Sequence, residues 1–283
     1  MRLGDALPAF SLAVGGAVAL LGVFFLMRGR VRIEKGWAGF TVARFNALER
    51  ITHWLLAVSF IVLAFSGLAM SYGRMLLLPM LGSQGFGEVL RMSNMLHGVV
   101  AFAFMAGLLL AFLLWVRHSL PHWRDAIWLL KGGGLVVRGV HPAAWKFNFG
   151  QKLLFWLTMI GGLLLALSGL ALLFPSMGLF ARTLAALSAL GLPAPAALTS
   201  DQETHHAAVW HGALASALIV VAIVHIVIRT VGIQGAFAAM GSGRVDANWA
   251  KQHHSLWAAQ ELKRMDAEAA GRDVGKAQIV TAE

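Results

Sequence analysis

The sequence predicts an all-α integral membrane protein, built as a four-helix bundle with one extra N-terminal transmembrane helix. The chain of 283 residues is 58% hydrophobic and only 13% charged, whereas about 25% of the residues in a soluble domain are charged. Its mean hydropathy is +0.72. The apolar stretches are long and continuous, which excludes the alternating pattern of a membrane β-barrel. The absence of cysteine excludes iron–sulfur ligation and covalently attached c-type haem on this chain.

Five apolar stretches free of Asp, Glu, Lys and Arg are long enough to cross about 30 Å of hydrocarbon at about 1.5 Å per residue. They are Leu7–Met27, Ile51–Tyr72, Ser93–Val116, Leu153–Ser176 and Thr204–Ile228. An arginine cluster follows the first stretch, whereas a signal peptide carries its positive charge before the apolar run. We therefore interpret the first stretch as an uncleaved anchor.

The spans predict three regions along the chain. They are an N-terminal transmembrane anchor with a basic cytoplasmic loop (1–50), the four-helix bundle (51–229) and a cytoplasmic tail (230–283).

Lys and Arg residues predict the orientation in the membrane, because they concentrate on the cytoplasmic side. The segments 28–50 and 117–152 hold six each and the segment from 229 onward holds seven, which is 19 of the 23 in the chain. The N-terminus is therefore expected outside and the C-terminus in the cytoplasm, with the chain in a bacterial inner membrane. The net charge of +10 is explained by this orientation, so no nucleic-acid partner is expected.

Four of the eleven histidines lie inside predicted spans, where ionisable residues are costly and usually functional. His211 and His225 are 14 residues apart on one helix, so they share a face and are separated by about 21 Å. His97 and His211 both lie near the outer ends of their spans, whereas His53 and His225 lie near the inner ends. The depths therefore predict an outer pair, His97 with His211, and an inner pair, His53 with His225.

Two stacked pairs of histidines in a helical bundle favour two haem b groups. Zinc is less suitable, because it usually takes three or four ligands. The four histidines are thus predicted to bind the haem irons, which makes the fold a four-helix dihaem cytochrome b bundle. Arg50 and Arg229, at inner helix ends, are expected near haem propionates, although ordinary anchoring by positive charge explains them equally well.

The loop before the fourth span has two interpretations. Asn148 and Gln151 have the spacing of a helix-capping box. Alternatively, Asn148 and the backbone of Gly150 form a quinone site. Spacing alone favours the capping box.

The sequence resembles the cytochrome b (gamma) subunit of respiratory formate dehydrogenase over roughly residues 44–258. The resemblance is carried by Arg44-Phe45, Glu49–Trp54, Leu96–Gly98, Lys146–Lys152, His211-Gly212, His225 and Trp249–Trp257. It implies that the four histidines are the axial ligands of two b haems, paired as above. It also implies a quinone site (menaquinone or ubiquinone) beside the inner haem, at positions matching Asn148, Gly150 and His225.

The resemblance further implies partners and a direction of electron flow. The chain would take electrons from an iron–sulfur (beta) subunit, supplied by a molybdenum or tungsten catalytic (alpha) subunit, and pass them across the membrane to quinone. It would be a subunit of a formate:quinone oxidoreductase, with formate oxidation on another chain, and the resemblance allows a higher oligomer of the complex. The first span departs from the family's short form.

The sequence leaves two other functions open. The cytochrome b subunit of a membrane-bound hydrogenase uses a similar bundle, although the 146–152 loop and the tail favour formate dehydrogenase. A proton-coupled transporter is the alternative from a different class, and it would be expected to carry intramembrane carboxylates or broken helices. The five spans contain no Asp or Glu.

Overall fold

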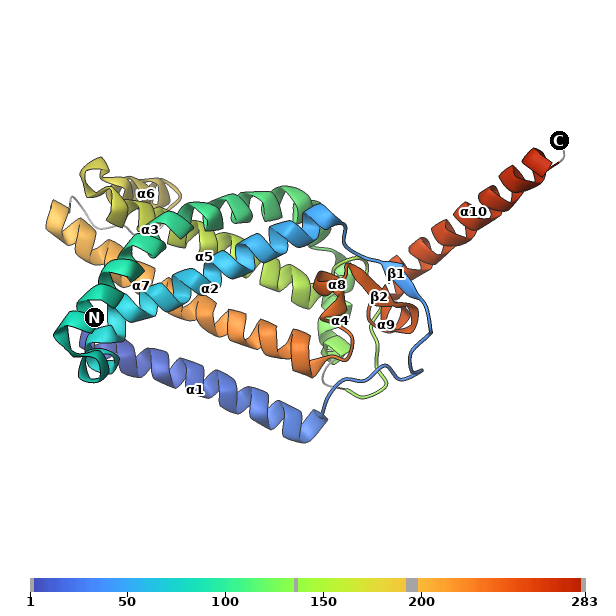
Figure 1. Cartoon of the computed structure of the whole chain (residues 1–283), viewed down its shortest axis with the longest axis horizontal. Coiled ribbons are helices and arrows are strands. Elements are labelled where there is room, and N and C mark those ends of the chain that lie inside the picture. The colour runs from blue at the N-terminus through green and yellow to red at the C-terminus, as the bar shows by residue number, and fades with distance from the viewer. Residues whose placement is uncertain (1–2, 135–136, 192–197, 281–283) are drawn as a thin grey trace. The chain divides into compact units, whose positions relative to one another are not determined.

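Five long apolar helices dominate the computed structural model, which describes residues 3–134, 137–191 and 198–280 (Figure 1). They are α1 (Leu3–Arg28), α2 (Ala47–Leu76), α3 (Leu78–Ser119), α5 (Phe149–Leu173) and α7 (Ser200–Val227). Each is long and apolar enough to cross a membrane, so the predicted all-α membrane fold with five spans is confirmed. The chain is a multi-pass membrane protein.

Shorter elements connect and extend these helices. They are α4 (Trp123–Leu130), α6 (Leu179–Ala189), α8 (Ala238–Gly241), α9 (Ala247–His253), α10 (Ser255–Val280), short 3₁₀ turns at Gly132–Gly134 and Pro175–Met177, a π-helical turn at Ile228–Gly232, and the strands β1 (Thr41–Ala43) and β2 (Arg244–Asp246). The strands pair antiparallel, with Val42 opposite Val245.

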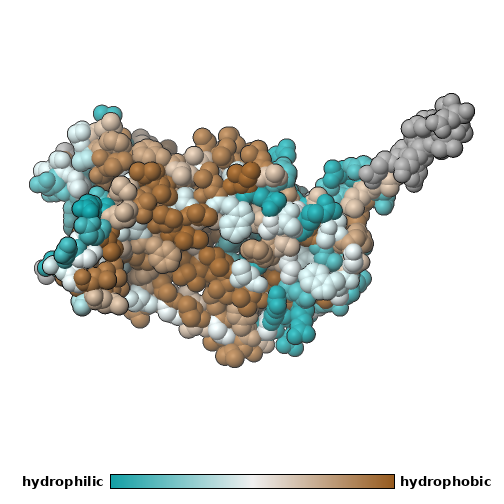
Figure 2. Space-filling view, in the orientation of Figure 1, coloured by the Kyte–Doolittle hydropathy of each residue, from teal (hydrophilic) through white to brown (hydrophobic). Residues whose placement is uncertain are grey.

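The chain divides into two compact units. The first unit comprises residues 1–23, 51–116 and 154–226 and therefore holds most of the five long helices. Many of its large apolar side chains face outward, for example Val99, Leu109 and Leu113. Figure 2 shows hydrophobic residues gathered over the long helices. An apolar outer surface of this kind suits lipid, in which every backbone polar group must be paired within the helix.

The second unit comprises residues 24–50, 117–153 and 227–283. It brings together the three basic segments that the charge pattern predicts on the cytoplasmic side. The three-region division at residues 50 and 229 remains a prediction, but the structure shows that segments far apart in sequence share this unit. The predicted tail contributes buried residues to it, since Val245, Trp249 and His254 are almost fully buried.

Arg44 is buried in the second unit. It donates to the carbonyl oxygen of Lys146 at 2.6 Å and lies 3.0 Å from Nε2 of His254, whose Nδ1 lies 2.8 Å from the carbonyl oxygen of Trp145. Its guanidinium also lies over the ring of Trp257 at 4.7 Å. Burial and the charge of Arg229 lower the pKa of Arg44 well below its usual value.

Two histidines of this unit, His253 and His254, have pKa values well below the usual one. Burial, followed by the charge of Arg229, lowers the pKa of His253 to about 3, and burial followed by Arg44 lowers the pKa of His254 well below its usual value. Below the ordinary pKa of about 6.5, the unfolded chain therefore binds more protons than the folded chain. These two histidines therefore leave the free energy of unfolding at its full value above pH 6.5. That free energy decreases as the pH falls from 6.5 toward the pKa values of the folded chain.

We expect the free energy of unfolding to fall by about 1.4 kcal/mol for each pH unit below 6.5 for each of these two histidines. Thermal unfolding of the detergent-solubilised protein at pH 7.5 and pH 5, followed by tryptophan fluorescence, measures this. His253→Gln should reduce the loss of melting temperature at pH 5, whereas His205→Gln, at an exposed position, should not. An equal loss in His253→Gln and in the wild type would contradict the assignment.

Candidate cofactor site

The structure brings the four intramembrane histidines together in the two predicted pairs, both within the first unit. The rings of His97 in α3 and His211 in α7 have centroids 6.1 Å apart. The rings of His53 in α2 and His225 in α7 have centroids 6.5 Å apart. Both pairs share α7, which is regular between residues 211 and 225, so the two pairs are separated by a rise of about 21 Å along its axis.

The spacing of each pair suits one metal ion held between two imidazoles. A metal–nitrogen bond to histidine is about 2 Å long, so two rings that bind one ion from opposite sides have centroids roughly 6 Å apart. Among the described residues, no group of three or more His, Asp or Glu side chains could hold a metal ion. Sites with two protein donors suit an ion whose remaining ligands come from a macrocycle, as in a haem with two axial histidines.

Two serines contact the rings of the outer pair, and neither of them was predicted from the sequence as a site residue. Ser66 Oγ in α2 lies 2.9 Å from Nδ1 of His97, and Ser168 Oγ in α5 lies 3.0 Å from Nδ1 of His211. Each hydroxyl donates its proton to a carbonyl one turn back, Ser66 to Val62 at 2.7 Å and Ser168 to Leu164 at 2.8 Å. Each hydroxyl therefore accepts from the histidine N–H, which leaves Nε2 with a free lone pair for a metal.

A glycine follows each of these serines and lies against the same ring. A Cβ atom added to Gly67 would lie 3.3 Å from Cε1 of His97, and one added to Gly169 would lie 3.3 Å from Cε1 of His211. The two Ser-Gly pairs belong to the sequence repeat Ser-Gly-Leu-Ala at 66–69 and 168–171. The repeat is the only signal in the sequence that points to the serines.

Between the outer and inner pairs, the helices pack closely around glycines. A Cβ atom added to Gly107 in α3 would lie 3.2 Å from the backbone of Leu56 in α2, and one added to Gly161 in α5 would lie 3.0 Å from the side chain of Leu218 in α7. Leu218 lies seven residues from both His211 and His225. The close contacts therefore form a packed middle layer that separates the two pairs.

The 146–152 loop belongs to the second unit and forms the predicted capping box. Oδ1 of Asn148 accepts from the backbone N–H of Gln151 at 3.0 Å, and Oε1 of Gln151 accepts from the N–H of Asn148 at 3.2 Å. Asn148 also lines a small pocket, together with residues that include His122, Asp125, Trp128 and Phe149. The capping role of Asn148 thus uses its carbonyl oxygen, and the side-chain NH₂ is the donor that remains for a ligand.

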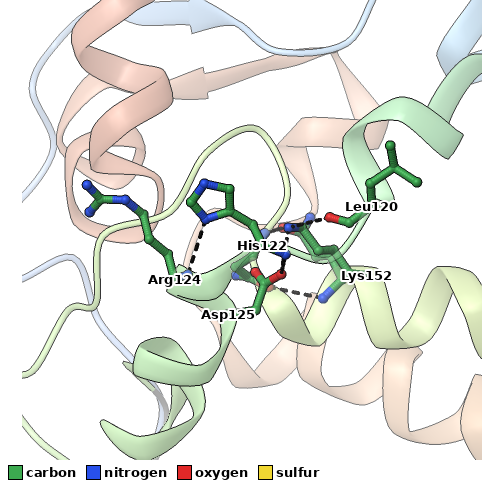
Figure 3. Close-up of polar contacts among 7 residues, drawn as sticks. Leu120, His122, Arg124, Asp125 and Lys152 are labelled. Carbon is green, nitrogen blue, oxygen red and sulfur yellow. Dashed lines mark hydrogen bonds and ion pairs between the residues drawn. The ribbon is translucent and has the colours of Figure 1, made fainter.

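Lys152 fixes the start of α4 beside this pocket (Figure 3). Its ammonium donates to Oδ2 of Asp125 at 2.8 Å and to the carbonyl of Leu120 at 2.9 Å. Asp125 in turn accepts from the N–H of His122 at 2.7 Å, which caps α4. Gly150 permits the indole ring of Trp128 to approach the backbone, since a Cβ atom at Gly150 would lie 3.2 Å from that ring.

The two arginines predicted near propionates also lie in the second unit. Arg50 donates from Nε to the carbonyl of Met240 at 3.3 Å and from its terminal nitrogen to the carbonyl of Gly241. Arg229 lies half-buried in the π-helical turn Ile228–Gly232. The backbone contacts of Arg50 explain its presence structurally, and a role of either residue toward propionates remains a prediction.

Comparisons with known proteins all find similarity to cytochrome b proteins. Over residues 44–243 the chain matches prokaryotic cytochrome b561. It is 30% identical to the formate dehydrogenase cytochrome b556(fdo) subunit of Escherichia coli (strain K12) over 218 residues, covering 77% of this chain and 92% of that protein. It is 25% identical to the nitrate-inducible cytochrome b556(Fdn) subunit of the same strain over 228 residues, covering 80% and 94%. The corresponding subunit of Haemophilus influenzae is 26% identical over 239 residues, covering 83% and 90%.

Proposed function

Because the chain belongs to the prokaryotic cytochrome b561 family, we propose that it is the dihaem membrane subunit of a formate:quinone oxidoreductase. Membership of a cytochrome b family implies that the chain binds haem b. The relatives reported above are named as formate dehydrogenase subunits, and the chain covers nearly their whole length. These names favour formate dehydrogenase over a hydrogenase subunit or a transporter. Formate oxidation itself belongs to another chain of the complex.

The observation that carries the proposal is the pair of facing histidines at each of two levels of one helical bundle. Bound haem iron would supply one-electron redox chemistry at each level. The protein's part would be to hold that iron, with His97 and His211 at the outer level and His53 and His225 at the inner level. Ser66 and Ser168 contact Nδ1 of the outer rings, which would leave Nε2 of each ring to bind the metal.

The proposed acceptor is a quinone bound at residues 148–150 of the second unit. The side-chain NH₂ of Asn148 would donate to a quinone carbonyl, while Trp128 and Phe149 provide an aromatic wall. Reduction of a quinone takes up two protons with two electrons, and titratable His122 and Asp125 line the same pocket. A hydrogen-bond donor, two aromatic rings and two ionisable side chains thus line one pocket, and this combination supports the proposal of a quinone site.

The proposed orientation places the second unit in the cytoplasm. It collects the segments that hold 19 of the 23 Lys and Arg residues, as the preference of these residues for the cytoplasmic side requires. The membrane is proposed to be the bacterial inner membrane, with the iron–sulfur and molybdenum or tungsten subunits as donors that deliver electrons at the outer level. Electrons then leave at the inner level.

A difference spectrum with haem quantitation tests the proposed function. We expect two b haems per chain in the purified complex, both reduced by formate in membranes. Hydrogen gas in place of formate is the matched control, and it should leave the haems oxidised. Fewer than two b haems per chain, or reduction by hydrogen and not by formate, would contradict the proposal.

A further inference from the structure

Each histidine of the outer pair contacts a Ser-Gly pair on a neighbouring helix. His97 meets Ser66 and Gly67 of α2, and His211 meets Ser168 and Gly169 of α5. The two halves match closely. The distances from serine Oγ to histidine Nδ1 are 2.9 and 3.0 Å, and a Cβ atom added to either glycine would lie 3.3 Å from Cε1 of the ring. Each ring is therefore fixed by a hydrogen bond at Nδ1 and by close contact at the adjacent carbon.

The direction of the hydrogen bond determines what the serine does to the ring. A hydroxyl has one proton, and the short contacts of Ser66 and Ser168 to carbonyls one turn back use it. Toward the histidine, the oxygen can then only accept. A histidine that donates its N–H to an acceptor becomes a more basic metal ligand at its other nitrogen, and its ring is held in one orientation.

We propose that Ser66 and Ser168 are positioning residues that lower the reduction potential of the outer haem, by accepting the N–H of both axial histidines. A more basic ligand binds ferric iron more strongly than ferrous iron, so the oxidised state gains stability. Because each serine acts on a different ligand of the same iron, their effects on the potential are additive. The proposal rests on the proposed function, since it requires a haem between His97 and His211.

The test is a potentiometric measurement of both haems in the intact complex carrying Ser66→Ala, Ser168→Ala or both substitutions. Loss of an outer-shell partner typically weakens metal binding about tenfold to a hundredfold. A tenfold loss confined to the ferric state raises the potential by about 59 mV for a one-electron couple. We expect a rise of about this size in each single variant, a rise near the sum in the double variant, and no change in the inner haem.

Two further variants separate this role from a general packing effect. Ser59 lies in α2 two turns before Ser66, is also buried, and donates to the carbonyl of Leu55 at 2.6 Å in the same way. Ser59→Ala should therefore leave both potentials unchanged. Ser66→Thr keeps the hydroxyl. The outer haem of this variant should therefore have nearly the wild-type potential, with a shift much smaller than that of Ser66→Ala. The low-spin ferric signal of the outer haem should change in Ser66→Ala and not in Ser59→Ala.

The outcomes distinguish the two proposals. A wild-type complex without haem between His97 and His211 would overturn the proposed function. A wild type that binds two haems, with an unchanged outer potential in the double alanine variant, would overturn only the role of the serines. An equal shift in Ser59→Ala would overturn it as well.

Discussion

His97→Ala is expected to remove one of two b haems and to leave the other in place. The ring of His97 faces only one other histidine, His211, and the described residues offer no third His, Asp or Glu donor at that level. Loss of one axial ligand leaves the iron with a single protein bond, so the haem is no longer held. Haem quantitation should fall from two per chain to one, and the remaining haem should keep the potential of the inner haem.

The pairing itself can be tested with the partner histidines. His211→Ala should remove the same haem as His97→Ala, and the double variant should remove no more. His53→Ala and His225→Ala should each remove the other haem. The exposed His205, also in α7, provides the control, since His205→Ala should keep both. If His97→Ala and His211→Ala removed different haems, the pairing would be wrong.

Asn148→Ala is expected to keep both haems and their reduction by formate, yet to slow quinone reduction about tenfold or more. Leaving a buried hydrogen-bonding group without its partner costs about 1–3 kcal/mol, and 1.4 kcal/mol corresponds to about a factor of ten in rate. The measurement compares formate-driven haem reduction with formate-driven quinone reduction in the same membranes. Unchanged quinone turnover would exclude Asn148 from the acceptor site.

Two variants separate the donor from the helix cap. Asn148→Asp keeps an oxygen that can accept from the backbone of Gln151, as Oδ1 of Asn148 does now, but it removes the NH₂ donor. It should therefore be as slow as Asn148→Ala. Gln151→Ala removes the other half of the capping box and leaves the donor in place. It should lower stability by about 1 kcal/mol and leave quinone turnover near that of the wild type.

The transmembrane pattern could be predicted from sequence because it depends on length and on the absence of charge. The pairing of the histidines followed from the same information, since depth along a regular helix depends only on residue count. Helix ends were harder to predict: α2 begins at Ala47, one turn before the apolar stretch, because Asn46 and Glu49 cap it reciprocally. The long α3 extends through Gly82, whose positive φ of 68° marks a kink that hydropathy does not reveal.

The serines and the second unit could not be predicted in the same way. Whether Ser66 faces His97 depends on how α2 is rotated about its axis and on which helix lies beside it, and hydropathy along one helix does not identify that neighbour. The second unit depends on Arg44 meeting His254, 210 residues away. A buried arginine in a basic loop has the same sequence signature as a solvated one, so only the tertiary structure reveals it.

The packed middle layer has an electrical consequence. The close contacts at Gly107, Gly161 and Leu218 lie between the two histidine pairs, so an electron that passes from one pair to the other crosses this layer and with it part of the transmembrane voltage. A rise of about 21 Å is roughly seven-tenths of a hydrocarbon thickness of about 30 Å. Inward movement of one electron over this distance therefore requires about 1.6 kcal/mol of work for each 100 mV of membrane potential. In the proposed orientation, the inner site must therefore offer the electron at least that much more stabilisation than the outer site if inward transfer is to remain downhill in an energised cell.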